Sequence, residues 1–163
     1  MQTKLKRVCF SAFAGAFATV LAATLLAQAP DPQVGTWKLN PAKSKYSPGP
    51  GPKSATTKIE AAGAGTKVVV DQVFADGSAR HWEFTANYDG KDVPVTGNNP
   101  DVDTIARTRV DANTVKSTSK KGGKVTTTQT SAVSSDGKTR TVTTTGTNAA
   151  GQTVNNVAVY EKQ

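Results

Sequence analysis

The sequence predicts an all-β domain after residue 29, built as a single antiparallel up-and-down meander of about ten strands. Threonine and valine dominate this part of the chain, and both are β-branched residues that favour strands. No stretch of it has apolar residues at the i, i+3, i+4 and i+7 spacing of an amphipathic helix. Asp-Gly and Gly-Gly pairs, such as Asp76-Gly77 and Gly122-Gly123, recur at the intervals of hairpin turns.

The first 29 residues predict a signal peptide. Lys4, Lys6 and Arg7 precede an uncharged run from Val8 to Ala27, and small residues follow it. The cut falls after Ala29 or after Ala27, and both positions stay open, because Pro30 is a poor residue directly after a cleaved bond. The run is also long enough for a retained membrane anchor, but its many alanines favour cleavage. We therefore expect an exported protein, periplasmic or extracellular, with no stable membrane span after cleavage.

Signal cleavage changes what the composition implies for the domain at residues 30–163. The only cysteine, Cys9, lies in the signal, so neither disulfides nor cysteine-ligated metals are expected in the domain. The three basic residues of the signal also leave, and the net charge falls from +8 to +5. The remaining basic residues are scattered and are not interleaved with aromatic ones, so we expect no nucleic-acid partner.

The turn signals delimit ten predicted strands, and strand four shows the clearest alternation. Trp82, Phe84, Ala86 and Tyr88 share one of its faces, as inward-pointing residues do. The predicted strands are Val34–Leu39, Thr56–Ala61, Lys67–Phe74, Ala79–Tyr88, Lys91–Val95, Thr104–Val110, Thr114–Lys120, Lys124–Val133, Lys138–Thr145 and Thr153–Glu161.

A meander of this size must protect its edges. Closure into a barrel is the usual solution for such a meander, and a two-sheet β-sandwich is the alternative. Residues 40–55 form one long loop, rich in proline and glycine in its second half, where regular structure is not expected. This loop is either a lid across a barrel mouth or a simple crossover between the first two strands.

The two ends of the domain carry a family resemblance. The first strand contains Gly35-Thr36-Trp37, and the last strand ends in Val159-Tyr160-Glu161-Lys162. With the strand count, these features resemble the lipocalin and fatty-acid-binding-protein superfamily, the calycins. More closely, the segments W-K-L-N-x-x-K-S-K, Y-D-G-K-D and N-V-A-V-Y-E-K resemble small secreted bacterial lipocalin-like proteins without assigned activity. The resemblance implies a lipocalin-like β-barrel with an apolar ligand inside, and Trp37 closing its base.

Two features depart from the fatty-acid-binding branch. That branch carries an R-x-Y pair on its last strand to hold a carboxylate; here Tyr160 stands at the tyrosine position, but Ala158 stands at the arginine position. The branch also has a helix-turn-helix between its first two strands, which the proline-rich loop cannot form.

Six residues are candidates for ligand binding: Trp82, Phe84, Tyr88, Arg107, Arg109 and Tyr160. The aromatic rings either pack the core or line a pocket, and both roles are compatible. Arg107 and Arg109 share a strand face with Ile105. Facing inward, they would replace the missing arginine, because arginine binds carboxylate bidentately. Facing outward, they are surface charges, and the cost of burying an unpaired charge favours this orientation.

Nothing in the sequence indicates catalysis, a metal site or a cofactor. His81 is the only histidine, and no G-x-S-x-G nucleophile motif is present. We predict a non-catalytic, lipocalin-like protein that binds a small hydrophobic or amphipathic molecule. The alternative is a structural or interaction module of the cell envelope, with its barrel filled by its own side chains. A continuous internal cavity of several hundred Å³ would favour the small-molecule-binding protein over the envelope module. The sequence does not indicate an oligomeric state.

Overall fold

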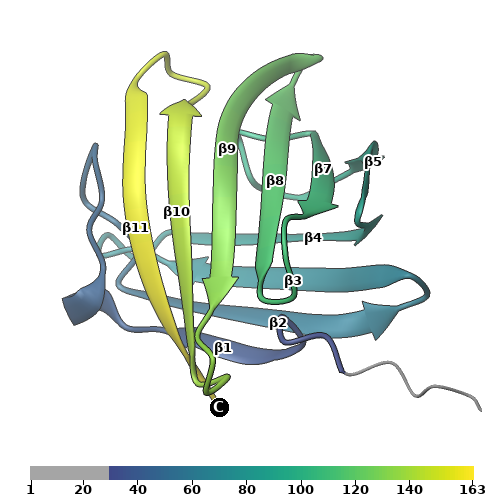
Figure 1. The fold of residues 1–163 in the computed structure, drawn as a ribbon. Helices are drawn as coiled ribbons and strands as arrows, with labels where there is room; N and C mark the ends of the chain where they lie inside the picture. The colour runs from purple at the N-terminus through teal and green to yellow at the C-terminus, as the bar shows by residue number, and fades with distance from the viewer. Residues whose placement is uncertain (1–29) are drawn as a thin grey trace, which may run out of the picture.

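The computed structural model describes residues 30–163, and there the chain forms one antiparallel sheet of eleven strands (Figure 1). The predicted signal peptide lies outside the described residues. The strands are β1 (Gly35–Leu39), β2 (Ser54–Ala62), β3 (Gly65–Val73), β4 (Ala79–Asn87), β5 (Asp89–Pro94), β6 (Thr96–Gly97), β7 (Thr104–Arg109), β8 (Thr114–Lys121), β9 (Lys124–Val133), β10 (Thr139–Thr147) and β11 (Thr153–Lys162).

The sheet curls into a nearly closed barrel. Strand β1 pairs with both β2 and β11, so the first and last strands of the chain are neighbours. The two free edges are β5, which pairs with β7, and β6, which pairs with β4. The chain therefore crosses from one edge to the other three times, from β4 to β5, from β5 to β6 and from β6 to β7. In Figure 1, β8 to β11 stand upright and β1 to β4 run crosswise behind and below them. The predicted all-β barrel is therefore confirmed, in a single continuous sheet.

All ten predicted strands are present, with ends that differ by at most a few residues. The eleventh, β6, is a two-residue strand that lies between two of the predicted strands and was not among them. It pairs with Trp82 and Glu83 of β4. Gly97 has a φ of 119°, and a Cβ there would run into the His81 carbonyl oxygen, so only glycine lets the chain lie this close to β4.

The base of the barrel is sealed by the residues just before β1. Trp37 is fully buried, and its indole Nε1 donates a hydrogen bond of 2.9 Å to the Gln33 carbonyl. Gln33 is itself fully buried, and its side-chain amide donates to the carbonyls of Asn113 and Ser131 at 2.8 and 3.2 Å. The chain before β1 thus closes one end of the barrel, where the resemblance placed Trp37.

The loop between β1 and β2 runs along β11. It begins with a short 3-10 helix, η1 (Pro41–Lys43), and its proline-rich second half has no regular structure, as expected. Backbone hydrogen bonds of 2.7 Å join Lys45 N to Val157 O and Asn155 N to Ser47 O. Within residues 30–163, no helix is both long and apolar enough to cross a membrane.

Candidate functional site: an internal cavity

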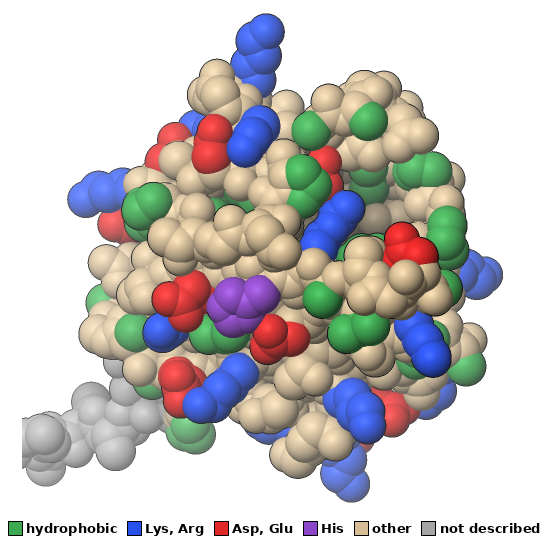
Figure 2. Space-filling model, turned by 180° about the vertical axis from the view of Figure 1, so that it is seen from behind, with side chains coloured by type: hydrophobic (Ala, Val, Ile, Leu, Met, Phe, Trp, Pro, Cys, Tyr) green, Lys and Arg blue, Asp and Glu red, His purple; other side chains and the backbone are tan. Residues whose placement is uncertain are grey.

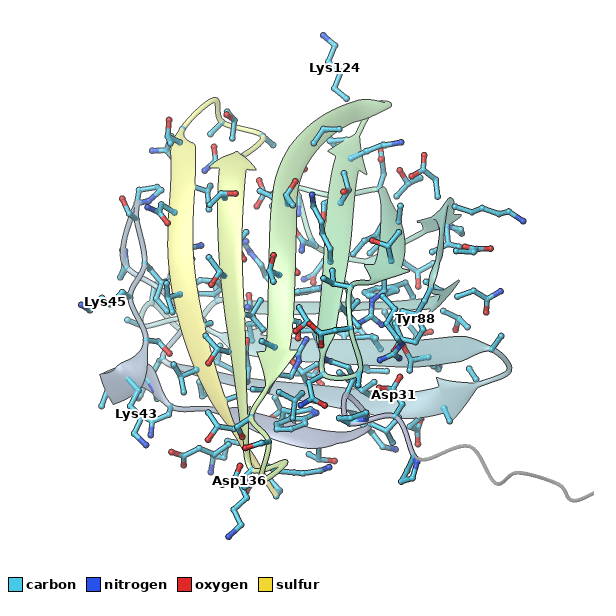
Figure 3. The ribbon with its side chains drawn as sticks, in the orientation of Figure 1. Asp31, Lys43, Lys45, Tyr88, Lys124 and Asp136 are labelled. Carbon is cyan, nitrogen blue, oxygen red and sulfur yellow. The ribbon has the colours of Figure 1, made fainter. Side chains whose placement is uncertain are left out.

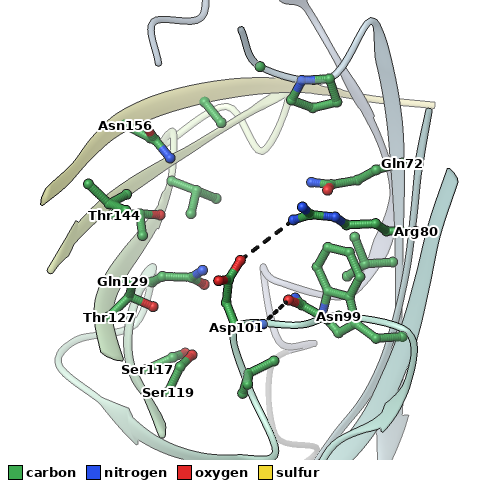
Figure 4. A pocket seen from close by; sticks show the side chains of 18 of the residues that line it. Gln72, Arg80, Asn99, Asp101, Ser117, Ser119, Thr127, Gln129, Thr144 and Asn156 are labelled. Carbon is green, nitrogen blue, oxygen red and sulfur yellow. Dashed lines mark hydrogen bonds and ion pairs between the residues drawn. The ribbon is translucent and has the colours of Figure 1, made fainter. Parts of the chain in front are cut away.

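The barrel encloses a cavity of about 400 Å³, which lies within the usual range of small-molecule sites. Its walls are the inward faces of the strands, and three connecting segments surround its mouth (Figure 4). These segments are the proline-rich loop at residues 46–52, the β6–β7 connection at residues 99–102 and the β10–β11 turn near Asn148.

One side of the cavity is apolar. Val68, Val70, Trp82 and Phe84, which we call the apolar wall, come from adjacent positions on β3 and β4. Val68 lies opposite Phe84, and Val70 lies opposite Trp82 in the ladder between the two strands. Alternation on a half-buried strand places all four on the inner face.

The other side carries hydroxyl and amide groups. Ser117, Gln129, Thr144 and Asn156 come from β8, β9, β10 and β11, and each lies opposite the next in the strand ladders. All four line the cavity, and we call them the polar row. Figure 4 shows them across the cavity from the β3 and β4 side chains. Ser119 and Thr127 form a second polar pair, one step along β8 and β9.

Arg107 projects into the barrel from β7. It is 2% exposed, and its Nη1 donates to Thr66 Oγ1 at 2.6 Å. Its Nε is buried and has no hydrogen-bond partner among residues 30–163. Burial lowers the pKa of Arg107, because the charged form loses its solvation. The inward position corrects our expectation that the cost of burial would turn this side chain outward.

Arg140 lies near the base of the cavity, on β10, directly opposite Tyr160 of β11. Its Nε donates to Ser131 Oγ at 2.7 Å and to Gln33 Oε1 at 3.2 Å. Its guanidinium carbon is 5.7 Å from the centre of the Tyr160 ring. Burial lowers its pKa to about 10, which leaves it protonated at neutral pH. An arginine therefore lies beside Tyr160 on the neighbouring strand, although residue 158 is alanine.

Four of the six predicted ligand-binding residues, Trp82, Phe84, Arg107 and Tyr160, line the cavity. The other two, Tyr88 and Arg109, lie beside it and meet Asp31 (Figure 3).

Tyr88 Oη and Arg109 Nη2 both donate to Asp31 Oδ2 at 2.5 Å, and the Arg109 guanidinium carbon is 4.0 Å from the centre of the Tyr88 ring. Burial acts to raise the pKa of Asp31, but the hydrogen bonds from Tyr88, the Gln33 backbone and Arg109 outweigh it and lower that pKa. The cluster fastens the segment before β1 to β7.

Sequence reasoning missed Arg140 and Gln33. Arg140 alternates with Val142 and Thr144, and this pattern was the available signal, because Val142 marks the inner face. Gln33 follows Pro30-Asp31-Pro32 beside the predicted signal, where no strand periodicity points to burial.

A polar bridge crosses the mouth. Arg80 Nη1 of β4 lies 3.6 Å from Asp101 Oδ2 (Figure 4). Ala149 N of the β10–β11 turn donates to Asp101 Oδ1 at 3.0 Å. Asp101 therefore connects the two sides of the barrel at the end away from Gln33.

His81 lies on the outer surface, among acidic and basic side chains (Figure 2). Its Nδ1 is 2.7 Å from Asp71 Oδ1, and both side chains are more than half exposed. Within the described part of the chain, no three His, Cys, Asp or Glu side chains are grouped closely enough to hold a metal ion.

No protein-family model and no curated protein matches this sequence. Among solved structures, the chain is similar to the crystal structure of zebrafish ileal bile acid-binding protein complexed with cholic acid. The two are 14% identical, with a TM-score of 0.45, and the match covers 81% of this chain and 99% of the zebrafish chain.

Proposed function

We propose that this protein binds a small amphipathic molecule with an anionic head inside its barrel, without catalysis. The observation that carries the proposal is the pair of buried arginines, Arg107 and Arg140. Neither forms a salt bridge with a carboxylate within residues 30–163, and the only acidic residue that lines the cavity is Asp101, at the mouth. Buried charges without counterions are costly, and an anionic head would supply the missing partner.

The donors of the two arginines suit such a head. Arg140 is held through its Nε by Ser131 and Gln33, which leaves its two terminal nitrogens for a ligand. Arg107 also lines the cavity and brings a second positive charge to it. Carboxylate, sulfate and phosphate all accept charge-assisted hydrogen bonds of this kind. The apolar wall then receives the body of the molecule. The open interior favours a binding protein over an envelope module with a filled barrel.

Export is the second part of the proposal. It rests on the basic, uncharged and small-residue regions of the first 29 residues. The protein would then work in the periplasm or outside the cell, as the resemblance to secreted lipocalin-like proteins implies. N-terminal sequencing of the protein recovered from its source cells tests this part. A chain that still begins at Met1 in the cytoplasm would contradict it.

Isothermal titration with oleate and with oleyl alcohol tests the head-group assignment. Wild-type protein should bind oleate, and Arg140→Met should bind it at least about tenfold more weakly, the loss of one charge-assisted contact. Binding of the uncharged alcohol should change little. Arg109→Met is the matched control, because Arg109 carries the same charge but does not line the cavity. Equal oleate affinity in wild type and Arg140→Met, with both folded, would refute the proposal.

A further inference from the structure

We infer that the ligand of this cavity carries hydroxyl groups along one side of its apolar body. The inference rests on the proposed function and specifies the ligand class of the same site. Its basis is the division of the cavity into an apolar wall on β3 and β4 and a polar row that crosses β8, β9, β10 and β11.

The polar row is continuous with the anion site. Arg107 lies opposite Ser117 in the β7–β8 ladder, and Ser117 begins the row. Five successive strands therefore present an uninterrupted line of hydrogen-bonding side chains to the interior. An apolar molecule held at Arg107 would lie against this line as well as against Trp82 and Phe84.

The hydroxyl groups of the row are available to a ligand. Ser117 and Ser119 are 6% and 5% exposed, and both line the cavity. Both side chains point into the cavity in Figure 4. Buried hydroxyls normally have a partner. A plain hydrocarbon chain would cover them without replacing their hydrogen bonds, whereas a hydroxylated one would satisfy them.

The spacing places the β10 part of the polar row well away from Arg140. Thr144 follows Arg140 by four residues on β10, and with Val142 between them the three share the inner face. Four residues of strand correspond to about 13 Å. The polar row therefore starts beside Arg107 and reaches the middle of an extended ligand whose anionic head sits at Arg140.

The test compares stearate with 12-hydroxystearate and 9,10-dihydroxystearate by isothermal titration. Wild-type protein should bind at least one hydroxylated acid about tenfold more tightly than stearate. The Ser117→Ala/Gln129→Leu double variant should lose this preference and bind stearate at least as tightly as wild type does. If the two residues had only a structural role, the double variant would bind all three acids more weakly. Thr130→Ala, on the outer face of β9, is the matched control and should keep the preference.

The outcomes separate the two proposals. Stearate that binds as tightly as both hydroxylated acids, or an unchanged preference in the double variant, overturns the inference and leaves the anion site standing. If none of the three acids binds the folded wild-type protein, both the proposed function and the inference are wrong.

Discussion

Arg140 illustrates what a single residue contributes to this site. Hydrogen bonds to its donors reduce the cost of burying a guanidinium, and here Ser131 and Gln33 both accept from Nε. The side chain is thereby oriented with its terminal nitrogens toward the interior. The same two residues also bond to each other, since Ser131 Oγ donates to Gln33 Oε1 at 2.9 Å. Gln33 is therefore a positioning residue for the anion site.

Replacing Gln33 should destabilise the fold. In Gln33→Leu, the Asn113 and Ser131 carbonyls lose their amide donor, and Arg140 Nε keeps only the Ser131 hydroxyl. Buried polar groups without partners should cost about 2–4 kcal/mol in the free energy of unfolding. Urea unfolding followed by Trp fluorescence measures this. Gln163→Leu, at an exposed position, is the control and should stay within about 0.5 kcal/mol of wild type. A Gln33→Leu protein as stable as this control would rule out the role of Gln33.

At the scale of elements, one edge of the sheet, that of β4, is covered only by the very short strand β6. Strand β6 covers only two residues of β4, and its position requires glycine at residue 97. The connection after β6 also returns to β4, because Asn98 N donates to His81 O at 2.8 Å. Unpaired edges favour pairing with other chains, and this short strand covers part of the β4 edge.

A side chain at Gly97 should lift β6 from β4. In Gly97→Ala, the new side chain is destabilised in two ways. The φ of 119° is unfavourable for alanine, and the added carbon clashes with the His81 carbonyl. We expect a loss of about 2–4 kcal/mol and faster amide hydrogen exchange at the β4–β6 edge, with β10 and β11 unaffected. Gly77→Ala is the matched control. Its φ of 83° is also positive, but nothing lies within 4 Å of the added carbon, so only the backbone penalty of about 1–2 kcal/mol applies. Equal effects of the two substitutions would show that contact with β4 is unimportant.

The elements of this fold could be predicted from the sequence better than the site. Strand β4 is predictable from Trp82, Phe84 and Ala86, because apolar residues alternate with polar ones on a half-buried strand. Strands β8 and β9 have hydroxyl and amide residues on both faces, so their pattern does not show which face is inside. Ser117 and Gln129 of the polar row lie on these strands, and their place in the row was therefore not predictable. Strand β6 is too short to show any periodicity.

At the scale of the whole molecule, the barrel is closed differently at its two ends. The base is sealed by buried groups of the segment before β1, with Gln33 inside the barrel and Asp31 bound to Tyr88 and Arg109. The mouth is bounded by loops and by the exposed Arg80–Asp101 pair, in which both side chains are about one-third exposed. Surface ion pairs contribute little to stability. A ligand would therefore enter at the mouth, where opening costs least, and its head would travel to the arginines near the base.

The Asp31 cluster should make the closed base sensitive to acid. The pKa of Asp31 is lowered in the folded protein, so the folded state holds its proton less strongly than the unfolded state does. The resulting stability is fully present above the unfolded pKa, about 3.9, and is lost as the pH falls through the folded pKa. Asp31→Asn removes the charge and should cost about 1–2 kcal/mol at pH 7.

Thermal or urea unfolding between pH 7 and pH 2.5 measures the difference between wild type and Asp31→Asn. The gap should be constant at neutral pH and should shrink below about pH 4, the acid range set by the carboxyl group. Tyr88→Phe keeps the carboxylate and its contact with Arg109, but removes one donor. Tyr88→Phe should therefore lose less stability at pH 7 than Asp31→Asn does, and part of its acid sensitivity should remain. A gap that does not depend on pH would mean that the Asp31 charge does not hold the base closed.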